Sequence, residues 1–198
     1  MTVVRRERLT RAQSQQRTRA AVVAAAVELF LTEGFRTTSL DVVAAAAGYT
    51  RGAVYSNFAD KAAMGIAVVD ELYRREERRL AELIETEPPD RLIDALSTWA
   101  EATVGDPRWM QLEIEVAALS GGNNRAATVE RHARLRALCR RLIDRFVDES
   151  AGVDRDLLAL GLVGMALGVG FQRAADPAIG GAQVGEMFRL LLPGACSR

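Results

Sequence analysis

The stretch YTRGAVYSNFADK, residues 49–61, carries the signals of a short helix with one exposed face. Thr50 is a preferred helix N-cap, so we predict a helix over 51–57. Arg51 and Tyr55 lie four residues apart on one helical face, and we expect both to point outward. An exposed Arg and Tyr suit the DNA major groove, where Arg reaches guanine and Tyr reaches phosphate. The alternative is a Tyr in the core beside a solvated Arg.

Two further helices are expected before this stretch. Residues 17–33 repeat apolar side chains at helical spacing and stop at Gly34. A second helix is expected to begin after Thr38, because Thr38 and Asp41 have the spacing of a capping box. Two short helices joined by a tight turn that contains Gly, behind a longer helix, are the layout of a helix-turn-helix.

This stretch and its lead-in, TSLDVVAAAAG at 38–48, resemble the signature of the TetR family of repressors, closely over residues 17–64 and weakly beyond. The resemblance implies an all-α protein with three parts: a basic arm (1–16), a helix-turn-helix DNA-binding domain (17–60) and a helical bundle for ligand binding and dimerisation (61–198). It implies a homodimer on an inverted repeat of double-stranded operator DNA and a small apolar or amphipathic effector. Neither a cofactor nor an enzymatic activity is expected.

The residues expected to contact DNA lie in and beside the third helix. Lys61 is the only Lys of the chain, at a helix start where the dipole disfavours a cation. A DNA phosphate bound there would explain it, and the alternative is an exposed Lys of small energetic cost. Small side chains at Ala53 and Ser56 leave most of the direct readout to Arg51. The full set is Thr38, Thr50, Arg51, Gly52, Ala53, Tyr55, Asn57 and Lys61, with both Thr residues acting first as caps.

Composition supports a DNA-binding end on an otherwise neutral chain. The formal net charge is zero, but residues 1–20 hold six Arg against one Glu. This indicates a polyanion contact at one end, or else a solvated disordered tail. With Cys139 and Cys196 as the only cysteines and no secretory signal, we expect a cytoplasmic protein with reduced thiols. The apolar run 157–171 is too short to span a bilayer, so no membrane partner is expected.

Helical spacing continues to the end of the chain. The expected helices cover 61–85, 90–104, 107–120, 123–150, 154–173 and 182–192, with Gly or Pro between them. In the fifth of these, Gly161, Gly164, Gly168 and Phe171 form a stripe that permits close approach of another helix. Because the resemblance implies that the last two long helices pair across a two-fold axis, we place this stripe at the dimer interface. The alternative is packing within one subunit.

Glu113 lies inside the apolar arc of its helix, where a carboxylate needs a partner or a water-filled cavity. We therefore expect the effector cavity among the helices that begin near 61, 90, 107 and 123. The expected lining residues are Trp99, Trp109, Met110, Glu113, His132 and Met165. The alternative is a structural ion pair between Glu113 and an Arg, an ordinary partly buried His132 and plain core aromatics.

Two other functions can be written for the same sequence. A helical-bundle metalloenzyme would use Glu113, Glu115, Glu130 and His132 as metal ligands. Di-metal bundles, however, contain repeated Glu-x-x-His pairs, and the chain lacks them. No Gly-rich phosphate loop, nucleophile elbow or Cys/His zinc spacing occurs either. A transcriptional activator with the same DNA-binding domain is the other alternative, because sequence does not separate activator from repressor.

Overall fold

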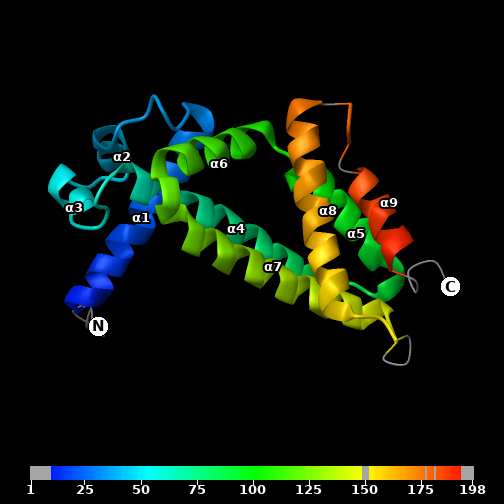
Figure 1. The fold of residues 1–198 in the computed structure, drawn as a ribbon. Helices are drawn as coiled ribbons and strands as arrows, with labels where there is room; N and C mark the ends of the chain where they lie inside the picture. Colours follow the sequence, from blue (N-terminus) through cyan, green and yellow to red (C-terminus); the bar gives the residue numbers. More distant parts are fainter. Residues whose placement is uncertain (1–9, 149–151, 177, 181, 193–198) are drawn as a thin grey trace, which may run out of the picture. The chain divides into compact units, whose positions relative to one another are not determined.

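The computed structural model describes residues 10–148, 152–176, 178–180 and 182–192. These residues form helices and no strand, which confirms the predicted all-α class. The elements are α1 (Arg11–Thr32), α2 (Leu40–Ala46), α3 (Arg51–Tyr55), α4 (Lys61–Thr86), α5 (Pro89–Thr103), α6 (Pro107–Ser120), the 3₁₀ turn η1 (Gly121–Asn124), α7 (Arg125–Phe146), α8 (Arg155–Ala175) and α9 (Ala182–Leu191) (Figure 1).

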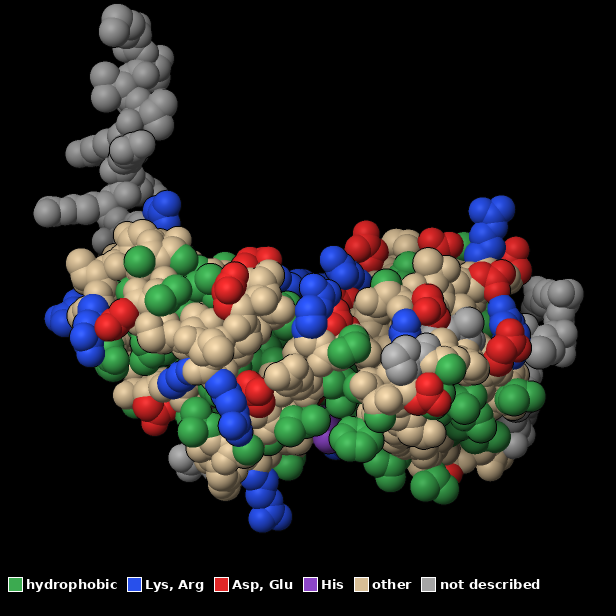
Figure 2. Space-filling view, turned by 90° about the horizontal axis from the view of Figure 1, so that it is seen from above, with side chains coloured by type: hydrophobic (Ala, Val, Ile, Leu, Met, Phe, Trp, Pro, Cys, Tyr) green, Lys and Arg blue, Asp and Glu red, His purple; other side chains and the backbone are tan. Residues whose placement is uncertain are grey.

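The chain divides into two compact units, Met1–Val68 and Val69–Arg198. The division falls inside α4, so this helix contributes residues to both units. It lies eight residues after the expected domain limit at residue 60. On the face shown in Figure 2, charged side chains of the two signs are interspersed, in keeping with the zero net charge.

The first helix begins earlier than predicted. Thr10 and Gln13 form a capping box: the Thr10 hydroxyl accepts from the Gln13 backbone N–H at 3.2 Å, and Gln13 Oε1 accepts from the Thr10 N–H at 2.8 Å. The helix therefore starts at Arg11, and the predicted start at residue 17 is wrong. The predicted arm over 1–16 loses its last six residues to α1, and residues 1–9 lie outside the described part of the chain.

A small core closes the first unit. Phe30 at the end of α1 meets Phe35 edge-on, with ring centroids 5.0 Å apart. Gly34 allows this reversal because its φ of +90° suits a residue without Cβ. Other fully buried side chains of this core come from α1, α2, α3, the loop after α3 and the start of α4: Val22, Ala26, Val27, Val43, Val54, Phe58, Met64 and Val68.

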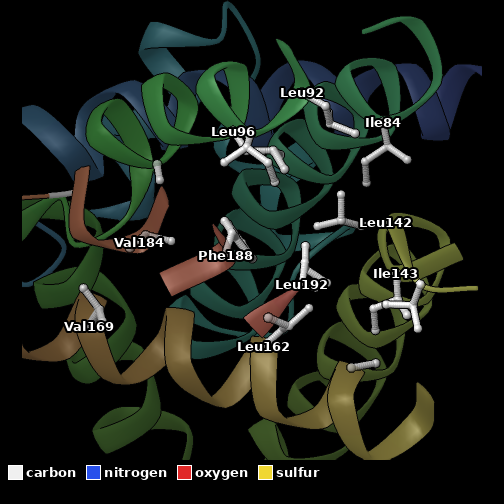
Figure 3. Close-up of a cluster of buried hydrophobic side chains, with 14 residues drawn as sticks. Ile84, Leu92, Leu96, Leu142, Ile143, Leu162, Val169, Val184, Phe188 and Leu192 are labelled. Carbon is white, nitrogen blue, oxygen red and sulfur yellow. The ribbon is translucent and has the colours of Figure 1, made fainter. Parts of the chain in front are cut away.

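The core of the second unit joins α5, α7, α8 and α9. Leu92 and Leu96 on α5 are fully buried, as are Ile143 on α7 and Leu192 just after α9. Figure 3 shows these side chains converging between the helices, together with Leu142, Leu162, Val169, Val184 and Phe188.

Helices α5 and α9 approach each other closely at Gly185. A Cβ atom built on Gly185 would lie 2.5 Å from the Cβ of Ser97 and 3.2 Å from its Cα. The hydroxyl of Ser97 turns back to the Ile93 carbonyl, to which it donates at 2.7 Å. The contact therefore requires a glycine at position 185.

The helix α8 is more apolar at its surface than the sequence interpretation allowed. It has 21 residues and is long and apolar enough, by length and composition, to cross a membrane, with 28% of its most apolar window buried. The prediction that this segment is too short to span is therefore wrong for the helix as a whole, because α8 extends beyond the apolar run at both ends. A helix this apolar and this little buried needs a further covering surface.

We predict that Gly185→Ala destabilises the protein. Alanine in a helix interior normally gains up to about 1 kcal/mol over glycine. Here the added methyl overlaps Ser97, and overpacking of this kind costs about 1–3 kcal/mol. Urea unfolding of the single variant and of Gly185→Ala with Ser97→Gly measures this, and we expect the second change to restore part of the loss. A Gly185→Ala variant as stable as the parent would contradict the contact.

Candidate nucleic-acid interface and cavity

The third helix is held by side chains at both ends. The Thr50 hydroxyl accepts from the Ala53 N–H at 3.2 Å, which confirms Thr50 as the N-cap. At the other end Ser56 Oγ and Asn57 Nδ2 both donate to the Ala53 carbonyl, at 2.9 Å and 2.8 Å. Since these side chains take the place of further backbone bonds, α3 stops at Tyr55, two residues before the predicted end.

Arg51 and Tyr55 point outward from α3, as the spacing predicted. The side chain of Arg51 is 68% exposed and Tyr55 is 44% exposed. The Arg51 guanidinium lies 5.3 Å from the centre of the Tyr55 ring, and its Nε lies 3.2 Å from the carboxylate of Asp41 on α2. Gly52 beside them is exposed, and nothing in the structure crowds it. The alternative of a core Tyr is wrong.

Thr38 is not the cap of α2. Its side chain is buried, and its hydroxyl donates to the Gly34 carbonyl at 2.8 Å. The cap is Ser39, whose hydroxyl accepts from the Val42 N–H at 3.2 Å. Burial of Leu40 sets this register, because it fixes the first turn of the helix. The hydroxyl of Thr38 is therefore used inside the unit, and the prediction that Thr38 caps α2 is wrong, whereas its contact with DNA stays a prediction.

Asn57 and Lys61 both act within the first unit. The Asn57 carbonyl accepts from Arg19 Nη1 at 2.9 Å, and the Arg19 guanidinium lies 4.3 Å from the centre of the Phe58 ring. Lys61 Nζ donates to the Arg36 carbonyl at 2.9 Å. Lys61 therefore has a hydrogen-bond partner within the unit, and its contact with a DNA phosphate stays a prediction.

A shallow hollow lies beside Lys61. Its rim includes Arg36, Thr37 and Ser39, together with Tyr55 and Lys61. The first three residues were not predicted as site residues, although exposed hydroxyls and an Arg before a helix start are the signal for phosphate contact. The rim combines cationic and hydroxyl groups, which are the donors that DNA-binding proteins offer to phosphate oxygens.

The second unit contains an apolar cavity of about 130 Å³. This volume is close to that of an engineered apolar cavity of about 150 Å³ that binds benzene. All six helices from α4 to α9 contribute to its wall. The predicted residues Trp99, Trp109, Met110 and Glu113 are among the lining residues.

His132 and Met165 do not line this cavity, so these two predictions are wrong. The part of the wall that α7 supplies is the stripe Leu135, Leu138, Cys139 and Leu142, which begins about one turn after His132. Burial lowers the pKa of His132, and the neighbouring charges of Arg131 and Arg136 lower it further. Met165 of α8 is partly buried and packs against the hydrophobic core of the second unit.

The partner of Glu113 is Tyr73 on α4. The Tyr73 hydroxyl donates to the carboxyl group, at 3.3 Å from Oε1 and 3.2 Å from Oε2. Burial raises the pKa of Glu113, while the charge of Arg131 and the Tyr73 hydrogen bond oppose that rise. Burial and the neighbouring Glu113 raise the pKa of Tyr73. The alternative of a direct Glu113–Arg ion pair has no counterpart among the described residues.

Two further polar side chains meet the ring of Tyr73. The Trp109 ring lies edge-on to it with centroids 5.2 Å apart, and the Arg131 guanidinium lies 5.3 Å from its centre. Arg131 is fully buried and donates through Nη2 to Thr128 Oγ1 at 3.0 Å. Within the described part of the chain, Trp109 Nε1 and the Nε and Nη1 atoms of Arg131 are buried without a partner.

The residues of the metalloenzyme alternative do not come together. Across 10–148, 152–176, 178–180 and 182–192, no three His, Cys, Asp or Glu side chains lie close enough to hold a metal ion. Glu130 instead pairs with Arg134 at 3.4 Å, and Glu115 accepts from Gln111 at 3.1 Å.

Solved structures of similar fold cover nearly the whole chain. A TetR-family transcriptional regulator from Pectobacterium atrosepticum is 26% identical with a TM-score of 0.72, over 96% of this chain and 99% of that one. NemR of E. coli, in its reduced form, is 19% identical with a TM-score of 0.70, over 90% and 99%. NalD, the secondary repressor of the MexAB-OprM multidrug efflux pump in Pseudomonas aeruginosa, is 23% identical with a TM-score of 0.55, over 91% and 96%.

The sequence itself matches a family model. Residues 22–68, which contain the second half of α1, all of α2 and α3 and the start of α4, match the model of the bacterial regulatory proteins of the tetR family. No curated protein sequence matches the chain significantly. The matched residues therefore form a helix-turn-helix of the tetR-family type, the all-α fold is shared with regulators of that family, and the chain is a DNA-binding transcriptional regulator.

Proposed function

We propose that the protein is a ligand-responsive repressor that binds an inverted-repeat operator as a homodimer and releases it when a small molecule enters the cavity. One observation carries the proposal. The helix α4 supplies Lys61 to the hollow of the first unit, which we take as part of the DNA-binding surface, and it supplies Tyr73 and Glu76 to the cavity wall of the second unit. A ligand that displaces this part of the wall therefore acts on α4, whose first residue is Lys61.

The expected effector is largely apolar, because aliphatic and aromatic side chains form most of the cavity wall. It can loosen DNA binding only through a difference in affinity for two arrangements of the protein. A coupling free energy of about 1–3 kcal/mol would weaken operator binding roughly 5- to 150-fold, which is enough to relieve repression. If the bound protein instead assists transcription from a nearby promoter, the same ligand-controlled DNA binding would regulate activation.

The proposed dimer face runs along α8. The stripe predicted from sequence is exposed there: Gly161 and Gly164 are exposed, and Phe171 is 62% exposed. A Cβ built on Gly161, Gly164 or Gly168 would meet nothing within 4 Å. The described residues therefore do not use the stripe for packing within one subunit. Leu157 and Leu160 of α8 are exposed at the same helical spacing and extend the apolar surface. A second copy covering this face accounts for the apolar character of α8 without a membrane.

We propose a cytoplasmic protein whose response does not depend on thiol chemistry at Cys139. Burial raises the pKa of the Cys139 thiol to about 12. The thiolate is the reactive form, so Cys139 is inert near neutral pH. Cys196 lies outside the described residues.

We predict that Arg51→Ala costs about 1–3 kcal/mol of specific binding and blurs discrimination at one operator position. Arg51 must exchange Asp41 for a base, but an exposed pair of this kind is worth only about 0–1 kcal/mol. Titrations with operator DNA, selected by the protein from a random pool, and with single-base variants measure the change. Arg91→Ala, an exposed Arg of α5, is the matched control and should bind as the parent does. Unchanged specificity in Arg51→Ala would contradict the assignment of α3.

We predict that Lys61→Ala weakens binding to all DNA sequences alike and reduces the salt slope by about one. Lys61 lines the hollow beside α3, and its positive charge is expected to attract a DNA phosphate there. Binding at several salt concentrations, with thermal unfolding of the free protein alongside, separates the two roles. An unchanged slope together with reduced stability would mean that Lys61 acts only within the fold.

We predict that Gly164→Leu disrupts the dimer. The leucine side chain would stand in the middle of the exposed stripe and push the paired helices apart. Light scattering of the free protein measures the mass, and Ala118→Leu, which adds a similar bulk to an exposed position of α6, is the control. An undiminished dimer in Gly164→Leu, or a monomeric parent protein, would show that this face is not the interface.

A further inference from the structure

The polar groups of the cavity wall gather at one place, around Tyr73. Trp109 and Glu113 are four residues apart on α6 and therefore share a helical face. Both line the cavity, and both contact Tyr73, one through its ring and the other through its carboxyl group. Tyr73, Trp109 and Glu113 form the part of the wall where a polar ligand atom would find hydrogen-bonding groups whose capacity is not fully used within the protein.

Of the two groups on α6, Trp109 can donate a hydrogen bond and Glu113 can accept one. The indole Nε1–H of Trp109 is a donor only, and it is buried without an acceptor in the described structure. The Glu113 carboxyl receives a single proton from Tyr73 and keeps an acceptor oxygen in either protonation state. A buried donor without a partner is costly, so a ligand oxygen that accepts from it gains more than one placed in water.

The remaining polar side chains of the wall limit the charge of the ligand. Its charged lining residues are Glu76, Asp106 and Glu113, and none is basic. An anion would therefore meet only carboxylates. Glu76 and Asp106 already have Arg partners, at 3.0 Å and 2.8 Å. A cation at Glu113 would face the charge of the buried Arg131, which already lowers the pKa of Glu113, and the Trp109 donor. These charges favour a neutral ligand.

We propose that the effector is a neutral one-ring alcohol or phenol whose hydroxyl group accepts from Trp109 Nε1–H and donates to the Glu113 carboxyl. The inference rests on the proposed function of the cavity and adds the chemical class of its occupant. A hydroxyl group fits because it is both donor and acceptor, whereas an ether or a ketone can satisfy only Trp109. The volume of about 130 Å³ fits a single substituted ring.

The test uses four probes of similar shape on the full chain. The probe p-cresol can donate and accept, 4-methylanisole can only accept, p-xylene can do neither, and 4-methylbenzoate carries a negative charge. The chain has two Trp residues, Trp99 and Trp109, and both line the cavity, so intrinsic fluorescence reports on it directly. Calorimetry confirms each affinity, and release of labelled operator DNA follows as a second readout.

Two variants separate the two hydrogen bonds. Trp109→Phe removes the indole donor, and we expect it to weaken p-cresol and 4-methylanisole by about 2- to 12-fold while p-xylene binds as before. Glu113→Met removes the carboxyl acceptor, and we expect it to weaken p-cresol by a similar factor while 4-methylanisole and p-xylene keep their affinities. In the parent protein, 4-methylbenzoate should bind more weakly than p-cresol. The p-xylene affinity is the internal control for damage to the cavity in each variant.

The outcomes separate this inference from the proposed function. If p-cresol and p-xylene bind and release the operator but respond alike to both substitutions, the effector cavity stands and the hydroxyl specificity is overturned. Tighter binding of 4-methylbenzoate than of p-cresol overturns it as well. If no probe binds to the parent protein, the cavity is not a ligand site, and the proposed induction mechanism fails together with the inference.

Discussion

Arg134 on α7 binds two carboxylates of α4, and this ionic contact fixes the helix on which the rest of the molecule depends. Its Nη2 lies 2.8 Å from Asp70, and its Nε lies 2.8 Å from Glu77, two turns further along α4. All three side chains are largely shielded from solvent, with exposures between 12% and 27%. Removing one member of such a pair strands the other charge, so the contact tolerates little variation. The cavity residues Tyr73 and Glu76 lie within the segment that Arg134 fixes.

This anchoring makes the wall of the cavity asymmetric. The Glu76 carboxylate accepts a hydrogen bond from the Trp99 indole at 2.9 Å and pairs with Arg79, and these two interactions hold it in place. Glu113 accepts a hydrogen bond from Tyr73 but has no ion pair within the described structure. A ligand is therefore expected to rearrange the α6 side of the wall first. Motion of α6 then changes its contact with Tyr73 and, through it, the forces on α4.

The sequence predicted those parts of the site that depend on local spacing. Arg51 and Tyr55 face outward because they are one turn apart, and Thr50 caps because it precedes that turn. Thr38 and Ser39 compete for one cap, and burial of Leu40, a tertiary event, decides between them. The early start of α1 was missed although Thr10 and Gln13 have the capping-box spacing that predicts it.

The cavity was only half predictable for the same reason. Trp109, Met110 and Glu113 were found because one helix presents them together. His132 and Met165 were wrong because the extent of a cavity depends on where neighbouring helices cross, which no single helix records. Tyr73 and Glu113 are 40 residues apart in the sequence, so nothing local announced their hydrogen bond.

The close approach of α5 and α9 at Gly185 limits which substitutions this sequence can accept during evolution. With the Ser97 side chain filling the space above it, position 185 accepts no larger residue until position 97 becomes smaller. The two positions are 88 residues apart, yet they behave as one site under substitution. In chains descended from this one, a change at one position should appear together with a compensating change at the other. Such a covarying pair would mark the packing of these two helices in sequences whose structures have never been determined.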